Sequence, residues 1–269
     1  MRPLVNLFSY AYRLIIDSLF PLSCEENEIV ALSPEQALKA LPLAPKCPFA
    51  DMHAVFHYKD VRVSRCVWNI KYKKDARSVR IAGFALWDML KRIMNEELRI
   101  KENAKSNTNT TNKRPTYLIV PIPITLRRRK ERGYNQCELI LDEIERLYRL
   151  EYADAYDLPL PHVDQTFTPI SVANVPQLIF EKNLLIRTQH KSHHKFKNRE
   201  ERLHDAQGIF GLNEKTLLKY KEMFGLDTLD TIQVIIIDDV ITTGSTMNEA
   251  LKTLREGGFL NATGVSVAH

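Results

Sequence analysis

Two adjacent carboxylates followed by small hydroxylated residues are the feature of this sequence best suited to chemistry. Asp238 and Asp239 come directly after an apolar run, in the string VIIIDDVITTGST at residues 234–246. In a parallel α/β sheet, ligands bind at the carboxyl ends of the strands, so both acids are expected at the edge of a site. The loop that follows consists of Thr242, Thr243, Gly244, Ser245 and Thr246.

This loop precedes a predicted helix, whose free backbone N–H groups and dipole make a seat for an anion. Gly244 lets the backbone approach closely, and the hydroxyl groups add hydrogen-bond donors. Carboxylates beside a phosphate seat suit a sugar phosphate, because the acids accept hydrogen bonds from ribose hydroxyls. They would also help to organise Mg²⁺, which prefers oxygen ligands and keeps several waters. The alternative is a structural corner in which Asp and Thr serve as turn formers and caps.

The whole string strongly resembles the phosphoribosyl pyrophosphate signature of the type I phosphoribosyltransferases, which are pentosyl-transferring glycosyltransferases. Every position from Val234 to Thr246 fits that pattern. The resemblance implies that Asp238 and Asp239 face the ribose hydroxyls and hold Mg²⁺ indirectly. It also implies that Thr242 to Thr246 bind the 5-phosphate.

A second motif, VPIPITLRRRKERGYNQ, occupies residues 120–136. A short apolar strand is expected to end here and to be followed by a basic stretch. Guanidinium groups form bidentate hydrogen bonds with phosphate oxygens, so arginines beside a sugar-phosphate site would meet a pyrophosphate. The alternative without a ligand-binding role is a solvated, basic start of a helix. The candidate residues for the pyrophosphate side are Arg127, Arg128, Arg132, Gly133, Asn135 and Gln136.

This second motif resembles the hallmark of the ComF family, the competence-associated phosphoribosyltransferase-like proteins. Three further stretches, at residues 15–24, 58–75 and 200–210, look like segments of that family. The resemblance covers most of the chain apart from two inserts. It implies a role in DNA uptake.

Two regions depart from the family pattern. ComF proteins usually open with paired C-x-x-C knuckles, whereas only Cys24 and Cys47 stand at the corresponding positions here, so we expect no structural zinc. The family's flexible loop appears as RTQHKSHH, residues 187–194. In phosphoribosyltransferases such a loop closes over the pyrophosphate. The candidate loop residues are Arg187, Lys191, His194 and Arg202.

Length and composition set the frame for these motifs. The 269 residues suffice for one large domain with a small appendage, and 44% hydrophobic with 26% charged residues is ordinary for a soluble protein. A net charge of +5 mildly favours an anionic partner. Four scattered cysteines indicate a reducing compartment, and no apolar run of about 18 residues is present, so a cytoplasmic protein without a membrane span is expected.

The element pattern predicts an α/β fold of the phosphoribosyltransferase type, with a mostly parallel sheet flanked by helices. A degenerate, helical or irregular segment is expected at 1–55 and the main domain at 56–269, with inserts near 102–114 and 154–177. Predicted strands cover 117–121, 184–187, 208–212, 232–237 and 262–268. Predicted helices begin at Ser33-Pro34 and cover 75–98, 137–150 and the residues from Met247 to Leu254.

Three functions stay open at this point. The leading hypothesis is a phosphoribosyltransferase that binds phosphoribosyl pyrophosphate with Mg²⁺ and transfers the sugar to a nitrogen acceptor that the sequence does not identify. The second is a competence factor that contacts single-stranded DNA through its basic loop, or that binds a protein of the competence machinery. The third is a sensor that binds phosphoribosyl pyrophosphate without turnover.

Overall fold

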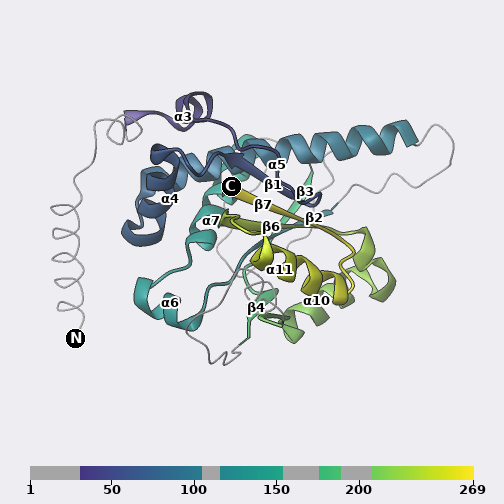
Figure 1. Ribbon diagram of the computed structural model, residues 1–269. Coiled ribbons are helices and arrows are strands. Elements are labelled where there is room, and N and C mark those ends of the chain that lie inside the picture. Colours follow the sequence, from purple (N-terminus) through teal and green to yellow (C-terminus); the bar gives the residue numbers. More distant parts are fainter. Residues whose placement is uncertain (1–30, 105–115, 154–175, 189–207) are drawn as a thin grey trace.

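The computed structural model describes residues 31–104, 116–153, 176–188 and 208–269 (Figure 1). Five strands form the main sheet in the order β1-β7-β6-β2-β3, and all neighbouring pairs are parallel. These strands are β1 (Met52–Phe56), β2 (Thr116–Pro121), β3 (Gln177–Phe180), β6 (Gln233–Val240) and β7 (Asn261–Ala268). A separate antiparallel pair consists of β4 (Leu185–Arg187) and β5 (Phe210–Leu212).

Helices cover both faces of the sheet (Figure 1). They are α3 (Pro34–Ala40), α4 (Val61–Lys73), α5 (Ala76–Ala104), α6 (Leu126–Arg132), α7 (Gln136–Glu151), α10 (Glu214–Phe224) and α11 (Ser245–Glu256), with a 3₁₀ turn, η2, at Leu226–Thr231. Within the described residues, none of the helices has the length and apolar character that crossing a membrane requires.

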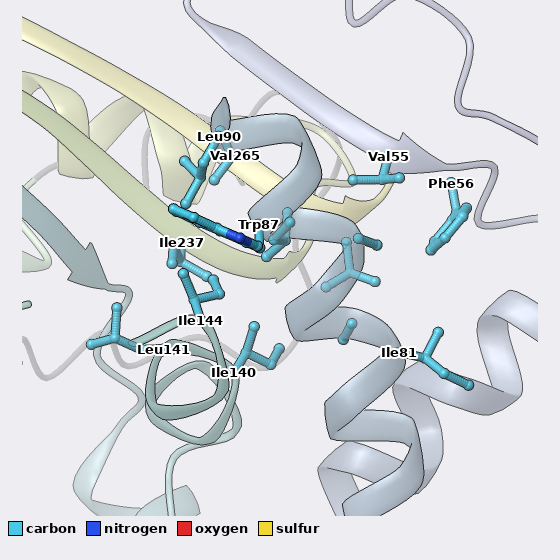
Figure 2. Close-up of a cluster of buried hydrophobic side chains, with 14 of the residues drawn as sticks. Val55, Phe56, Ile81, Trp87, Leu90, Ile140, Leu141, Ile144, Ile237 and Val265 are labelled. Carbon is cyan, nitrogen blue, oxygen red and sulfur yellow. The ribbon is translucent and has the colours of Figure 1, made fainter. Parts of the chain in front are cut away.

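The sheet divides the apolar interior into two cores. Ile235 and Ile237 of β6 face the core built with α5 and α7, which Figure 2 shows around Trp87. Val234 and Ile236 face the other core, built with α10 and α11. Side chains alternate along a strand, so a continuous apolar run is what a strand covered on both faces requires.

The neighbouring strands β2 and β6 form a topological switch point. From β2 the chain leaves through α6 and α7 and returns as β3 on one side of the sheet. From β6 it leaves through α11, on the opposite face, and returns as β7 on the other side. A crevice outside the carboxyl ends of two such strands is the usual ligand site of an open α/β sheet.

Several predicted elements are confirmed. The helix that begins at Ser33 has the expected capping box, in which Ser33 and Gln36 bond to each other's backbone N–H groups. The strands predicted at 117–121 and 262–268 and the helix predicted at 137–150 match β2, β7 and α7 within one or two residues. An α/β fold with helices on both faces of the sheet is therefore observed.

Other element predictions are wrong in their extent. The helix predicted to end near Leu98 continues to Ala104 and enters the expected insert at 102–114. The strand predicted to end at Ile237 continues to Val240, so the acidic pair belongs to the strand itself. β3 begins at Gln177, the last residue of the expected insert at 154–177.

Two short strands do not join the main sheet. Those predicted at 184–187 and 208–212 pair only with each other, as β4 and β5. At the other edge, β1 contains the predicted boundary between residues 55 and 56, and it pairs with β7. The last residues of the expected N-terminal segment thus take part in the main sheet.

Candidate functional site

The acidic pair is buried at the carboxyl end of β6. Asp238 is 9% exposed and Asp239 is 4% exposed. The Asp239 N–H donates to Asp238 Oδ1 over 2.8 Å, and the Cys137 thiol donates to the same oxygen over 3.5 Å. Burial, together with the charge of Asp239, raises the pKa of the Asp238 carboxyl well above its usual range. Asp238 therefore retains a proton more readily than a carboxyl in water.

A lysine from a distant helix neutralises the second acid. Lys71 Nζ of α4 lies 2.7 Å from Asp239 Oδ2, and both side chains are largely buried. Burial opposes the lysine charge, but the attraction and hydrogen bond of Asp239 outweigh it, so the pKa of Lys71 is raised. Lys71 and Asp239 therefore form a charged pair that offsets the negative charge of the site.

The start of α7 holds Cys137 against the acidic pair. Asn135 is the N-cap, and its Oδ1 accepts from the Cys137 N–H over 3.0 Å. The Asn135 side-chain amide donates to the Ile122 carbonyl over 2.9 Å, which ties α7 to the chain after β2. Burial, with the nearby carboxyls, raises the pKa of the Cys137 thiol, so it remains a protonated donor to Asp238.

The predicted phosphate loop leads directly into α11. Gly244 is the N-cap in the left-handed conformation, with φ 74°, and it has no side chain to cap the helix. The Ser245 N–H donates to the Thr243 hydroxyl over a long 3.5 Å. Thr242 and Thr243 are exposed, and the Thr243 and Ser245 hydroxyls are 2.8 Å apart. Thr246 is half-buried in the first turn. The loop thus combines the N-terminus of a 12-residue helix with accessible hydroxyl groups.

An aromatic ring from the N-terminal part of the chain lies against this loop. A Cβ added to Gly244 would stand 2.9 Å from Phe49 Cδ2 and still closer to the neighbouring ring carbon. Only glycine therefore fits here, both for its backbone angle and for the ring above it. Phe49 was not among the predicted site residues.

The second motif forms α6 and the turn into α7. Thr125 caps α6 by accepting from the Arg128 N–H, and Gly133 ends the helix with φ 80°. Arg127 is exposed and ion-paired with Glu131, as expected for a solvated basic helix. Arg132 donates to Gln136 Oε1 over 2.9 Å and lies 5.0 Å over the Tyr72 ring.

Arg187 is affected by the charges of both the basic helix and the acids. It is half-buried at the end of β4, with its guanidinium 5.3 Å over the Phe210 ring. Burial, and then the charge of Arg128, lower the pKa of Arg187, while Asp238 acts in the opposite direction. The charges of Arg128 and Asp238 therefore both act on Arg187. The predicted loop residues Lys191, His194 and Arg202 lie outside the described part of the chain.

Helix α4 presents an aromatic and basic face beside the acidic pair. The Trp68 and Tyr72 rings lie 5.4 Å apart, and the Arg65 guanidinium lies 4.7 Å over Trp68. A cavity of about 340 Å³ lies along this face, and Lys71 forms part of its wall. Asp60 begins the helix by accepting from the N–H groups of Arg62 and Val63. Lys71 thus links the cavity to Asp239.

The donor atoms of the pair suit a hard cation better than a soft one. Within the described residues, Cys137, Asp238 and Asp239 are grouped with ligand atoms within 4.8 Å of one another. The carboxylate oxygens fit Mg²⁺, whereas a protonated thiol does not. Lys71 already contacts Asp239, so Mg²⁺ would be held indirectly, through water and ligand oxygens. The expectation about zinc stays a prediction, because Cys24 lies outside the described residues.

Lys71 and Cys137 escaped the sequence-based prediction. Lys71 is one of three lysines in IKYKKD and carries no signature of its own. Asp60 as an N-cap would have predicted α4, and the spacing of three and four residues would have put Lys71 on one face with Val67 and Ser64. Cys137 follows an Asn cap directly, which places its side chain at a helix start.

Comparisons with known proteins do not identify a family for this chain. No protein-family model matches the chain, and no match was found among curated proteins. The resemblances to the phosphoribosyl pyrophosphate signature and to the ComF family therefore remain predictions based on the motifs.

Proposed function

We propose that the chain binds phosphoribosyl pyrophosphate at the carboxyl edge of β2 and β6 and acts as a ComF-like type I phosphoribosyltransferase. One observation carries the proposal. The buried acids of β6 and the N-terminus of α11 occur together at a topological switch point of the sheet. A corner that was only structural would gain nothing from two adjacent buried carboxylates, because each buried charge costs free energy.

The residues divide into three binding roles. The N–H groups at the start of α11, with the Thr243 and Ser245 hydroxyls, receive the 5-phosphate. Asp238 and Asp239 meet the ribose hydroxyls. Arg128 and Arg187 supply positive charge for the pyrophosphate.

Two adjacent carboxyls suit the two ribose hydroxyls. A carboxyl that keeps its proton offers one O–H donor and one acceptor oxygen, whereas a carboxylate offers acceptors alone, and the raised pKa of Asp238 favours the first form at that residue. The two ribose hydroxyls are both donors and acceptors, so such a mixed pair can bond to both. Lys71 brings a positive charge beside Asp239, which offsets part of the negative charge of the pair.

The reaction is a substitution at C1 of the ribose. A nitrogen lone pair of the acceptor forms the new N–C1 bond, and the bond between C1 and the pyrophosphate oxygen breaks with its electron pair on that oxygen. A proton on the attacking nitrogen passes to water or to the departing pyrophosphate. Arg128 and Arg187 stabilise the negative charge that develops there. Mg²⁺, when bound, would neutralise part of the same charge.

Calorimetric titration of the full chain with phosphoribosyl pyrophosphate, with and without Mg²⁺, tests the proposal. We expect Mg²⁺-dependent binding that weakens at least about tenfold in Asp238→Asn, because an NH₂ group replaces an oxygen that can accept from a ribose hydroxyl. Asp142→Asn, on the exposed side of α7, is the matched control and should bind like the wild type. A folded wild type that does not bind the compound would refute the proposal.

A further inference from the structure

Helix α11 carries a buried carboxyl to which the proposed function gives no role. Glu249 is 7% exposed and lies in the second turn of the helix, whose N-terminus is the proposed seat of the 5-phosphate. Its Oε1 accepts the backbone N–H of Gly208, just before β5. A buried carboxyl costs free energy unless its oxygens find donors, so this bond fixes both groups. Glu249 therefore ties the chain at the start of β5 to α11.

A row of hydrogen bonds continues from Gly208 to the end of β4. The Gly208 carbonyl accepts from the Thr188 hydroxyl over 2.7 Å, and the Thr188 N–H donates to the Ile209 carbonyl over 2.9 Å. Thr188 directly follows Arg187, whose guanidinium lies 5.3 Å over the Phe210 ring. The bonds that begin on α11 therefore end at the residue beside Arg187.

The position of the β4–β5 pair depends on α11. In the described part of the chain these two strands pair with each other and not with the five-stranded sheet. The pair lies beside α11 (Figure 1), and a Cβ on Gly257 would collide with Leu212 at the end of β5. This packing holds the end of β5 that is paired with Leu185. Glu249 holds the opposite end, which is paired with Arg187.

We infer that Glu249 is a positioning residue for the pyrophosphate end of the ligand. Through Gly208 and Thr188 it holds Arg187 in a fixed place relative to the phosphate seat on the same helix. The inference rests on the proposed function, which assigns Arg187 to the pyrophosphate. Glu249 itself does not touch the ligand.

The physical reason is that guanidinium contacts with phosphate depend on orientation. A bidentate pair needs its donors aligned within about 0.5 Å and 10–20° of the acceptor oxygens. Phosphoribosyl pyrophosphate carries anionic groups at both ends of the ribose, so it gains from two subsites that are already fixed relative to each other. Loss of the Glu249 bond would leave the charge of Arg187 in place but would weaken its alignment.

Two substitutions of similar length test this role. Glu249→Met removes the acceptor of the Gly208 N–H, whereas Glu249→Gln keeps an acceptor oxygen in its place. Calorimetry on the full chain with Mg²⁺ compares phosphoribosyl pyrophosphate with ribose 5-phosphate, which lacks only the pyrophosphate. We expect Glu249→Met to weaken the first ligand about fivefold and the second less than about twofold. Glu249→Gln should restore the affinity to that of the wild type.

A matched control removes a second carboxyl from the same helix. Glu256→Met, at the exposed end of α11, should leave both affinities unchanged, because Glu256 makes only a 3.8 Å contact with Lys252. Loss of affinity in this control would mean that charge on α11, and not the bond to Gly208, sets the affinity, and it would overturn the inference.

A double-mutant cycle shows whether Glu249 acts through Arg187. If it does, Glu249→Met should add less than about 1.5-fold to the loss already caused by Arg187→Gln, because the two changes remove one interaction. A residue that only stabilises the fold would not produce this result. A full fivefold loss in the Arg187→Gln background would overturn the inference.

A second variant breaks the same row of bonds without a change in the core. Thr188 is exposed, so Thr188→Val keeps the fold, and it removes the hydroxyl that donates to Gly208. We expect it to weaken phosphoribosyl pyrophosphate about threefold and to leave ribose 5-phosphate unchanged. Thermal unfolding checks that each variant is folded, and this variant alone decides the matter if Glu249→Met is not.

The outcomes separate this inference from the proposed function. A wild type that binds phosphoribosyl pyrophosphate, with no selective loss in folded Glu249→Met or in Thr188→Val, would overturn the positioning role and leave the proposed function standing. Equal losses for both ligands would indicate a general structural role and would also overturn it. A folded wild type that does not bind phosphoribosyl pyrophosphate would refute the proposed function, and the positioning role with it.

Discussion

The two sides of the acidic pair are built in different ways. On the α11 side, the proposed phosphate loop follows the acids within a few residues of sequence, and it offers backbone N–H groups and hydroxyls, of which those of Thr242 and Thr243 are exposed. On the α4 side, Lys71 comes from more than 160 residues away and is buried against Asp239. One side is local and open, while the other is assembled by the fold.

This difference indicates that the α11 side serves ligand binding, whereas the α4 side contributes to the stability of the fold. An open helix N-terminus contributes little to folding and is available to an anion. A buried ion pair instead couples folding to the charge of the site, because removing one partner leaves the other charge uncompensated. The α4 side should therefore respond to substitution mainly in stability, and the α11 side mainly in ligand affinity.

The largest expected effect is on the α4 side. Lys71→Met leaves Asp239 buried without its cation, and we expect the free energy of unfolding to fall by about 3 kcal/mol at neutral pH. Lys91→Met is the matched control, since the ion pair of Lys91 with Glu151 is on the surface and is worth less than about 1 kcal/mol. Urea denaturation of both variants measures the contrast, and equal losses would break it.

On the α11 side, Gly244→Ala should disturb both loop and ligand. The left-handed backbone costs alanine about 1–2 kcal/mol, and its Cβ also collides with Phe49. Gly133→Ala is a sharp control, because Gly133 has a similar φ of 80° and nothing within 4 Å of an added Cβ. Only Gly244→Ala should lose ribose 5-phosphate binding in calorimetry. Loss in both variants would mean that the loop is not the seat.

The effect of an arginine on pyrophosphate affinity should depend on where it lies, and not only on the loss of one positive charge. Arg187→Gln removes a half-buried cation near Asp238 and should weaken pyrophosphate binding about tenfold. Arg127→Gln removes an exposed cation that is paired with Glu131 and should change affinity less than about twofold. Competition titrations with inorganic pyrophosphate and Mg²⁺ compare them. An equal loss would indicate a diffuse electrostatic effect.

The smallest expected effect is a gain of stability in Asp238→Asn. Because the folded-state pKa of Asp238 is raised, its contribution to stability is present below about pH 4, the pKa of the unfolded chain, and is lost as the pH rises through the folded-state pKa. The variant should therefore exceed the wild type by about 1 kcal/mol at pH 7.5 and match it near pH 4. Denaturation at the two pH values decides this, and a gain that is the same at both would contradict it.

The local half of the site could be predicted from the sequence. The acids, the loop and the helix start lie in one string, so Asp238, Gly244 and Ser245 are found without knowledge of the fold. The strand signal was equally local, because β6 is an uninterrupted apolar run covered on both faces. The sequence predicts the end of this strand three residues too early, because Asp is rare in strands while β6 continues through both acids to Val240.

The assembled half could not be predicted. Helical spacing separates the face of Lys71 from that of Lys73, but only the packing of α4 turns the Lys71 face toward Asp239. The Phe49 ring lies against Gly244, but Phe49 belongs to an irregular segment whose sequence has no helical or strand periodicity from which this contact could be predicted. Contacts between distant segments depend on tertiary packing, which local pattern does not encode.

Phosphorus NMR of phosphoribosyl pyrophosphate titrated with the full chain and Mg²⁺ is the most direct test of the central claim, a sugar-phosphate site at the carboxyl edge of β6. The 5-phosphate and the two pyrophosphate phosphorus atoms give separate signals. The account predicts that all shift with the wild type, that Gly244→Ala abolishes the 5-phosphate shift, and that Arg187→Gln reduces the pyrophosphate shifts alone. A folded wild-type chain that shifts none of these signals would contradict it.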